Sequence, residues 1–110
     1  MSWCGAICIA VSLWLDGHGY TVQQRNAVLS YIHHESDFDP CEVSRNGAFL
    51  FQWAGSRRRQ ILALGNGRCP SLETQLEFAD SELRTTFSRF WSTNNPRTYI
   101  RRCFGAGACR

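Results

Sequence analysis

The segment from His33 to Pro40, with the sequence HHESDFDP, brings together two histidines and three carboxylic acids, residue types that transfer protons or hold metal ions. A carboxylic acid that keeps its proton near neutral pH can donate it to the oxygen of a leaving group, which is general acid catalysis. The same residues can also form a metal site or a solvated helix end. The surroundings of Glu35, the first acid of the segment, decide among these three interpretations.

Glu35 falls on the apolar face of a predicted helix. Val28, Tyr31 and Ile32 form that face, and Glu35 follows Tyr31 by four residues and Ile32 by three. We therefore expect its carboxyl group to point toward the core or a cleft. Desolvation there and the negative end of the helix dipole both favour the protonated acid. The alternative is that Glu35 ends an amphipathic helix and forms a salt bridge with an arginine.

The two histidines do not predict a metal site. His33 and His34 are neighbours in the sequence. On a helix their side chains point about 100° apart and cannot bind one ion as an i, i+4 pair does. We interpret both as surface residues beside Glu35, and we expect neither a metal nor a cofactor.

Helix start and stop signals divide the chain into five short helices. The expected helices cover residues 3–15, 22–35, 57–64, 72–90 and 96–105, and the fourth of them is the longest. The expected N-caps are Thr21, Ser56, Ser71 and Asn95, the last followed by Pro96 at the first helical position. The fourth helix carries an apolar stripe that is expected in the core, formed by Leu72, Leu76, Ala79, Leu83, Phe87 and Phe90.

Residues 46–54 lose the helical period. The apolar run from Phe49 to Trp53 predicts a short strand or a buried turn, which periodicity alone cannot separate. No internal repeat or linker is visible, so we expect one domain over residues 1–110, mainly α, with five or so helices and this short irregular or β segment. A domain of 110 residues has a thin core, which predicts additional covalent staples.

Six cysteines supply those staples as disulfides. They lack the C-x-x-C pairs and Cys/His ladders that bind zinc, and this cysteine content in a short chain indicates an oxidising compartment rather than free thiols in the cytosol. Two cysteines four residues apart on one helix are not expected to pair with each other. The expected bridges join Cys4 and Cys8 to Cys103 and Cys109, and Cys41 to Cys69, although the sequence leaves other pairings open.

All twelve basic residues are arginine, against nine acids, which gives a formal charge of +3. Guanidinium groups make planar, bidentate contacts with anions, so this mild excess favours an anionic polymer as the partner. No long basic run or aromatic RNA-binding motif is present, which argues against nucleic acid. The apolar segment from Ala6 to Leu15 lacks a preceding basic residue and is too short to span a bilayer, so we expect a buried helix and no stable membrane insertion.

Three sequence elements together resemble the lysozyme-like superfamily of peptidoglycan lytic enzymes, which includes goose-type lysozymes and lytic transglycosylases. They are ESDFDP at residues 35–40, Ser44, and NGAFLFQWAGSRRRQIL at residues 46–62. A glutamate–serine pair, a later serine and a glycine-containing stretch ending in glutamine form the superfamily signature. The continuation QWAGSRRRQIL is closer still to the phage-tail lysozyme branch. The resemblance covers residues 15–90 in layout and is specific over residues 30–62.

This resemblance implies a lysozyme-like fold and a muramidase, which would cleave the β-1,4 bond between N-acetylmuramic acid and N-acetylglucosamine in the glycan strand of peptidoglycan. Glu35 matches the catalytic acid/base, and Gln52 matches a residue that lines the sugar cleft. Asp37 and Asp39 are the candidates for a second catalytic carboxylate, with capping of the helix end and loop formation as the alternative. We expect a monomer that is periplasmic or secreted, and a phage genome is one expected source of its gene.

Ser44 and Trp53 complete the expected substrate-binding residues. Aromatic side chains stack on sugar rings in glycan clefts, but for Trp53 core packing is an equal alternative. For Gln52 the alternative is to satisfy backbone groups in a buried turn. The arginines at residues 57–59 are expected on a solvated helix face at the rim of the cleft, with pairing to Glu35 or Asp37 as a further option.

Other functions stay open at this point. A lytic transglycosylase would release anhydromuramic products and needs no second carboxylate, because a hydroxyl of the substrate attacks the anomeric carbon. A non-catalytic binding protein for cell-wall glycan is suggested by two departures from the family pattern: Asp37 stands where a glycine is usual, and Phe49, which is expected to crowd the cleft, stands where lytic transglycosylases carry another glycine. A cationic protein that lyses membranes has no support beyond net charge.

Overall fold

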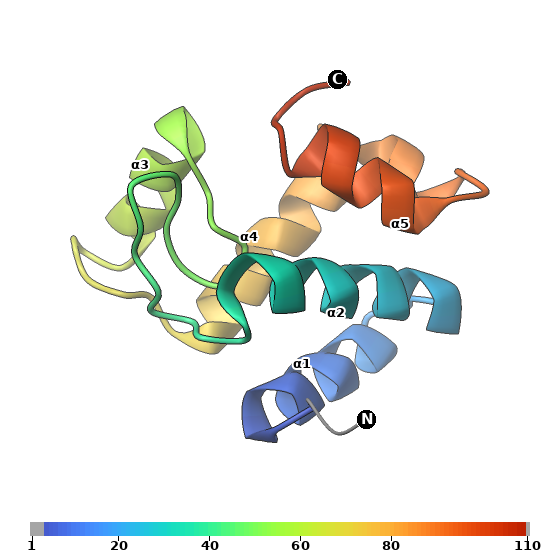
Figure 1. Ribbon diagram of the computed structural model, residues 1–110, viewed down its shortest axis with the longest axis horizontal. Coiled ribbons are helices and arrows are strands. Elements are labelled where there is room, and N and C mark those ends of the chain that lie inside the picture. The colour runs from blue at the N-terminus through green and yellow to red at the C-terminus, as the bar shows by residue number, and fades with distance from the viewer. Residues whose placement is uncertain (1–3, 110) are drawn as a thin grey trace.

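The computed structural model describes residues 4–109, which are mainly helical (Figure 1). The elements in chain order are α1 (Ala6–Gly17), α2 (Val22–Ser36), α3 (Gly55–Leu64), α4 (Leu72–Arg84), a 3₁₀ turn η1 (Ser88–Trp91), α5 (Pro96–Tyr99) and a π-helical turn η2 (Ile100–Phe104). Within the described residues, β structure is limited to two isolated bridges, Val43 with Ala48 and Ala48 with Trp53. The predicted mainly α fold with a short irregular segment is therefore confirmed.

α2 is the helix that carries Glu35, and its start is defined by a capping box. The Thr21 side chain accepts a hydrogen bond from the Gln24 backbone N–H, and the Gln24 side chain accepts one from the Thr21 N–H. The helix ends at Ser36, and the C-cap residue Asp37 has a left-handed backbone with φ 50°. With 15 residues α2 is longer than α4, which has 13, so the prediction that the fourth helix is the longest is wrong.

α4 begins as expected but ends earlier. The Ser71 hydroxyl accepts from the Thr74 N–H at 3.1 Å, which confirms this N-cap. The helix stops at Arg84, and Phe87 and Phe90 follow it in a turn and in η1. Both rings are nevertheless buried, at 1 % and 0 % exposure. The stripe therefore continues into the core although the helix does not.

α3 starts without a side-chain cap. Ala54 occupies the N-cap position and Gly55, at φ 60°, is the first helical residue, so the prediction of Ser56 as the cap is wrong. At the other end of the chain the prediction is confirmed, because the Asn95 side chain accepts from the Thr98 N–H and Pro96 opens α5. α5 and η2 then lie alongside α2 (Figure 1).

The three disulfides pair Cys4 with Cys8, Cys41 with Cys69, and Cys103 with Cys109. The Cys41–Cys69 bridge confirms the prediction. The expected crosswise pairing of the four terminal cysteines is wrong, because Cys4 precedes the first residue of α1 and Cys109 follows η2. Helical spacing therefore does not apply to either pair, and their Cα atoms approach to 5.1 and 5.0 Å, within disulfide range.

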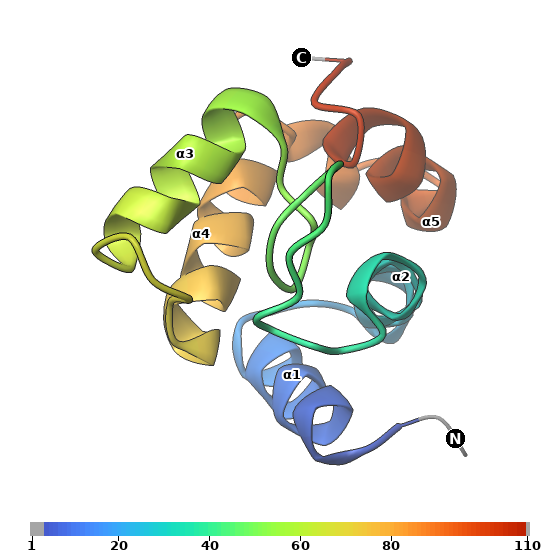
Figure 2. The same ribbon diagram turned by 60° about the vertical axis from the view of Figure 1, so that its left-hand side comes forward.

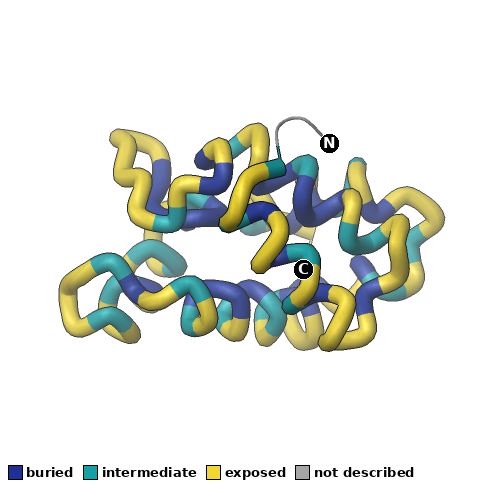
Figure 3. Tube along the Cα trace, turned by 90° about the horizontal axis from the view of Figure 1, so that it is seen from below, coloured by how far each residue is buried: buried dark blue, intermediate teal, exposed yellow. Residues whose placement is uncertain are grey.

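The segment that joins α2 to α3 lies between α2 and α4 (Figure 2). Its apolar residues from Ala48 to Phe51 are buried, so the turn forms part of the core rather than covering it. Buried and exposed positions alternate around the coils, with the buried ones facing inward (Figure 3). Within the described residues, no helix has the length and apolar character needed to cross a membrane.

Candidate active site

Glu35 occupies the last turn of α2, with its side chain 29 % exposed. The Nε2 atom of its neighbour His34 lies 3.9 Å from Glu35 Oε2. Among the described residues no arginine lies within ion-pair distance of this carboxyl group. The alternative of an arginine salt bridge at Glu35 is therefore not realised there, and the acid stays half-buried and accessible.

Tyr31 lies one helical turn before Glu35 on the same stripe of α2. Its hydroxyl donates to the Phe51 carbonyl at 3.2 Å, which links the helix to the buried turn. Burial, and after it the charge of Glu35, raises the pKa of the Tyr31 phenol above its usual range. The phenol therefore stays a hydrogen-bond donor, and the Glu35 carboxyl is close enough to act on it electrostatically.

Ser36 fixes the end of α2 at the residue next to Glu35. It is only 8 % exposed, and its hydroxyl donates to the Leu50 carbonyl at 2.7 Å. A buried hydroxyl bonded to a distant backbone group holds the last turn of the helix in one orientation. The glutamate–serine pair thus combines an accessible acid with a buried anchor.

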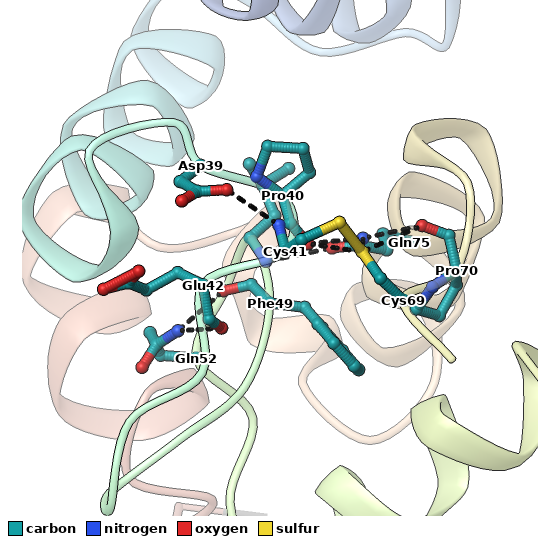
Figure 4. The surroundings of a disulfide bond; sticks show 10 residues. Asp39, Pro40, Cys41, Glu42, Phe49, Gln52, Cys69, Pro70 and Gln75 are labelled. Atoms are coloured by element: carbon teal, nitrogen blue, oxygen red, sulfur yellow. Dashed lines mark hydrogen bonds between the residues drawn. A yellow bond between two sulfur atoms is a disulfide. The ribbon is translucent and has the colours of Figure 1, made fainter. Parts of the chain in front are cut away.

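Asp37 and Asp39 both have local partners. The Asp37 carboxylate, 81 % exposed, lies 2.9 Å from His33 Nδ1, one turn back on the helix. Asp39 Oδ1 accepts from the Cys41 N–H at 3.0 Å, which is the side-chain turn that aspartate forms in loops (Figure 4). These contacts match the capping and loop-forming alternative, and the catalytic role of either residue stays a prediction.

Glu42 was not singled out from the sequence. It is exposed, and within the described residues its carboxylate makes no hydrogen bond or ion pair. Figure 4 shows this side chain pointing away from the Cys41–Cys69 bridge. Among the acids of the loop that follows α2, Glu42 is therefore the one whose carboxylate has no structural partner in the described chain. A lone glutamate in a loop carries no sequence signal that distinguishes it from a surface charge.

Ser44 and Gln52 contact each other. The Ser44 hydroxyl donates to Gln52 Oε1 at 2.9 Å. Gln52 Nε2 donates to the Glu42 and Phe49 carbonyls at 3.0 and 2.9 Å (Figure 4). The Gln52 amide thus closes the loop on itself, as the backbone-satisfying alternative expects. Their predicted contacts with sugar stay predictions.

Trp53 is buried, at 2 % exposure, and its indole N–H donates to Glu82 Oε1 at 2.9 Å. The ring packs against Phe51 and Phe78. The ring and the polar atom of the indole both have partners inside the protein. The structure therefore places Trp53 in the core rather than on a sugar-binding surface.

A pocket of about 680 Å³ opens beside the Glu35 helix. α2 lines it with Ser30, Tyr31 and His34, and the α5–η2 segment lines it with Arg97, Ile100 and Arg101. Glu35 is the residue after His34 and lies one helical turn beyond Tyr31. The candidate acid thus follows the pocket-lining part of α2 without lining the pocket itself. No metal-binding cluster of histidine, cysteine and acids is found among the described residues.

The sequence from residue 9 to residue 103 matches the family of phage tail lysozymes. This chain belongs to that family. The match includes the whole of α2 with Glu35, the loop that follows it, and both walls of the pocket. It confirms the resemblance to the lysozyme-like superfamily. Comparisons with curated proteins and with solved structures give no match.

This member of the phage tail lysozyme family accommodates the two departures from the superfamily pattern without placing either residue in the lining of the pocket. Asp37 and Phe49, which replace expected glycines, have φ values of 50° and 70°, the left-handed region that glycine favours. Phe49 is 3 % exposed, so its ring lies in the core instead of crowding the cleft as expected. The chain keeps the path that glycine would permit and strains the backbone instead.

Gly47 explains a glycine of the family motif. A Cβ atom at this position would lie 2.5 Å from the Gln52 backbone oxygen, because residues 47 and 52 face each other across the tight turn. The Gln52 backbone is itself left-handed, at φ 54°. The motif NGAFLFQ therefore encodes a closely apposed turn that delivers Gln52 to its loop partners.

Arg57 does not cover a solvated face, contrary to the expectation for the arginine cluster. Its guanidinium forms a bidentate pair with Glu82, at 2.7 and 2.9 Å, and donates to the Phe104 carbonyl at 2.7 Å. The side chains of Arg57 and Glu82 are only 11 % and 13 % exposed. The guanidinium also lies over the rings of Phe87 and Phe104. This pair joins α3 to α4 and η2 rather than serving Glu35 or Asp37.

Gln75 supports the site from α4 and was missed from the sequence. It is 0 % exposed, its Oε1 accepts from the Leu50 N–H at 2.9 Å, and its Nε2 donates to the Pro40 and Pro70 carbonyls at 2.8 and 3.0 Å (Figure 4). Leu50 is also the residue that holds Ser36. One buried amide therefore connects α4 to both ends of the loop that follows Glu35.

We expect Gln75→Leu to destabilise the protein by about 2 to 4 kcal/mol, because each buried polar group left unpaired costs roughly 1 to 3 kcal/mol. Urea unfolding followed by circular dichroism measures this change. Gln60→Leu is the matched control, since Gln60 is exposed on α3 and makes no side-chain hydrogen bond in the described structure. An equal loss for both variants would contradict the role assigned to Gln75.

Proposed function

We propose that this protein is a muramidase that cleaves the β-1,4 bond between N-acetylmuramic acid and N-acetylglucosamine in peptidoglycan. The observation that carries the proposal is Glu35, a half-buried acid without an arginine partner in the described chain, directly after the pocket-lining part of α2 in a member of the phage tail lysozyme family. Family membership supports peptidoglycan as the substrate. Family membership and three disulfides are also consistent with an extracellular or periplasmic site of action.

In this mechanism the protonated Glu35 carboxyl donates to the glycosidic oxygen as the sugar takes on oxocarbenium character. The buried anchor at Ser36 keeps the acid in place while the bond breaks. Water then adds to the anomeric carbon and gives a proton to a carboxylate of the site. The pathway needs a second carboxylate, about 5 Å from the first in a retaining enzyme and roughly 6.5–9.5 Å from it in an inverting one.

For that second carboxylate, Asp37 and Asp39 remain candidates together with Glu42. The contacts of the two aspartates favour Glu42, because its carboxylate has no structural partner within the described residues. All three acids follow α2 within seven residues of Glu35. Replacing each acid separately distinguishes them.

The local partners of the two aspartates also support a second candidate, a lytic transglycosylase. In that reaction a hydroxyl of the substrate attacks the anomeric carbon, so no second carboxylate is required and an anhydro sugar forms. Glu35 would serve first as the acid and then as the base. A binding protein without turnover receives less support, since Phe49 leaves the pocket open.

Product analysis tests the proposal. Purified peptidoglycan is incubated with the protein, and the released fragments are analysed by mass spectrometry before and after borohydride reduction. We expect fragments that end in reducing N-acetylmuramic acid, which gain two hydrogens on reduction. Fragments with anhydromuramic ends would show that the protein is a lytic transglycosylase instead of a hydrolase. If the glycan stays intact while the protein still binds it, the protein is a binding protein and both enzymatic functions are wrong.

A further inference from the structure

We propose that the pocket between α2 and the α5–η2 segment is a carboxylate-binding subsite, which takes the acidic substituent of the glycan. The inference rests on the proposed function and names the part of the substrate that this surface recognises. Arg97 and Arg101 are four residues apart and line the pocket from one wall. Tyr31 and His34 line the opposite wall, and none of the lining residues is acidic.

Arg97 and Arg101 form no ion pair with an acid of the described chain. Three arginines of the described chain, Arg25, Arg57 and Arg84, are paired with acids, whereas Arg97 and Arg101 belong to the exposed arginines that are not. In the described chain, Arg97 and Arg101 have no carboxylate within ion-pair distance and no side-chain hydrogen bond. Two guanidinium groups that line a pocket without a partner match the planar, bidentate geometry of a bound carboxylate.

The position of the pocket relative to Glu35 identifies the substrate group. One wall includes the residue next to Glu35 and the residue one turn before it, which is about 5.4 Å along the helix axis. A sugar whose glycosidic oxygen reaches Glu35 therefore has its substituents within reach of the pocket. In peptidoglycan that substituent is the lactyl group of muramic acid, which carries either a free carboxylate or a peptide with its own carboxylates.

This assignment predicts discrimination between two glycans with the same backbone linkage. A chitin oligosaccharide consists of N-acetylglucosamine alone and carries no carboxylate. A muramic-acid-containing oligosaccharide of equal length carries one on every second sugar. The two arginines should strengthen binding of the second glycan and leave binding of the first unchanged.

The test compares Arg97→Gln/Arg101→Gln with Arg68→Gln/Arg102→Gln, each in a Glu35→Gln background that prevents turnover. Arg68 and Arg102 are exposed and do not line the pocket, so the control removes the same charge elsewhere. Nuclear magnetic resonance titrations measure Kd for three tetrasaccharides: chitotetraose, a peptide-free muramyl oligosaccharide, and the same oligosaccharide with peptide stems. Circular dichroism shows whether each variant is folded.

We expect the Arg97/Arg101 variant to bind at least one muramyl ligand about 10-fold more weakly than the control does, with chitotetraose affinity unchanged, because charge-assisted hydrogen bonds are lost. A loss confined to the peptide-free ligand assigns the site to the lactyl carboxylate, and a loss confined to the stem-bearing ligand assigns it to the peptide. Equal losses for all three ligands, or none, would overturn the inference.

Cleavage of peptidoglycan and binding of muramyl ligands are separate measurements, so the carboxylate subsite and the muramidase activity can each fail alone. If wild-type protein cleaves peptidoglycan and the arginine variant binds every ligand as its control does, the subsite is wrong and the muramidase proposal stands. If wild-type protein leaves peptidoglycan intact while the arginine variant still loses affinity for muramyl ligands, the muramidase proposal fails and the carboxylate site stands.

Discussion

Replacing Glu35 with glutamine should lower the rate of peptidoglycan cleavage by about 100- to 10,000-fold, the usual contribution of a positioned general acid. Glutamine has nearly the same shape but no acidic proton to give to the glycosidic oxygen. The side chain is half-buried and forms no salt bridge to arginine in the described chain, so the fold should be unaffected. The rate is measured as the release of muropeptides, with thermal unfolding as the check on structure.

Matched substitutions of the neighbouring acids make this result specific. Asp37→Asn and Asp39→Asn remove equal charge from the same loop, and Glu42→Gln removes the carboxylate without a structural partner in the described chain. A large loss with Glu42→Gln identifies the second carboxylate of a hydrolase. If Glu35→Gln keeps more than a tenth of the wild-type rate, Glu35 is not the acid.

Replacing Arg57 with methionine should destabilise the protein by about 3 to 5 kcal/mol, the cost of removing one partner from a buried ion pair. Glu82 would then be left almost fully buried, and the contacts of the guanidinium with Phe87, Phe104 and the Phe104 carbonyl would also be lost. Urea unfolding at neutral pH gives the free energy of unfolding for each variant.

Two further variants separate the ion pair from general damage. Arg59→Met changes an exposed arginine on the same helix and should alter stability by no more than about 0.5 kcal/mol. Arg57→Met combined with Glu82→Gln should be more stable than the sum of the single losses predicts, because no uncompensated charge remains and glutamine can still accept from Trp53. A loss for Arg57→Met no larger than that for Arg59→Met would show that the pair is not structural.

Local signals explain why much of the helical layout was predictable. The Thr21 and Ser71 caps and the Asn95-Pro96 start each depend on atoms within three residues of one another, so the sequence contains the whole interaction. The orientation of Glu35 was accessible for the same reason, since helical geometry relates it to Tyr31 and Ile32. The family motif indicated a catalytic role for Glu35, which stays a prediction.

The incorrect predictions concern where helices start and stop. Ser56 has a side chain suited to capping, but the tight turn before α3 lets the helix begin at Gly55. Apolar spacing continued past Arg84, although the helix breaks there, because a turn and η1 bury Phe87 and Phe90 equally well. The cysteine pairs failed similarly, since the end of α1 nearest Cys4 was placed three residues too early.

The support of the candidate site was the least predictable part. Trp53 and Gln75 bond to partners 29 and 25 residues away, Glu82 and Leu50, and no pattern in the sequence specifies which distant groups will meet. A polar residue with such partners resembles a surface residue until the fold is known. Glu82 and Arg57 were hidden in the same way, because their burial depends on three separate elements.

The dipeptides Pro40-Cys41 and Cys69-Pro70 are connected twice, once covalently by the disulfide and once by the Gln75 amide, which bridges both proline carbonyls. The two connections are broken by different reagents. Thiols reduce the disulfide, whereas denaturants weaken the hydrogen bonds of Gln75. Both connections join the loop that follows α2 to the segment that precedes α4. In the muramidase proposed above, this double connection would hold the loop next to Glu35 under the oxidising conditions in which disulfides persist.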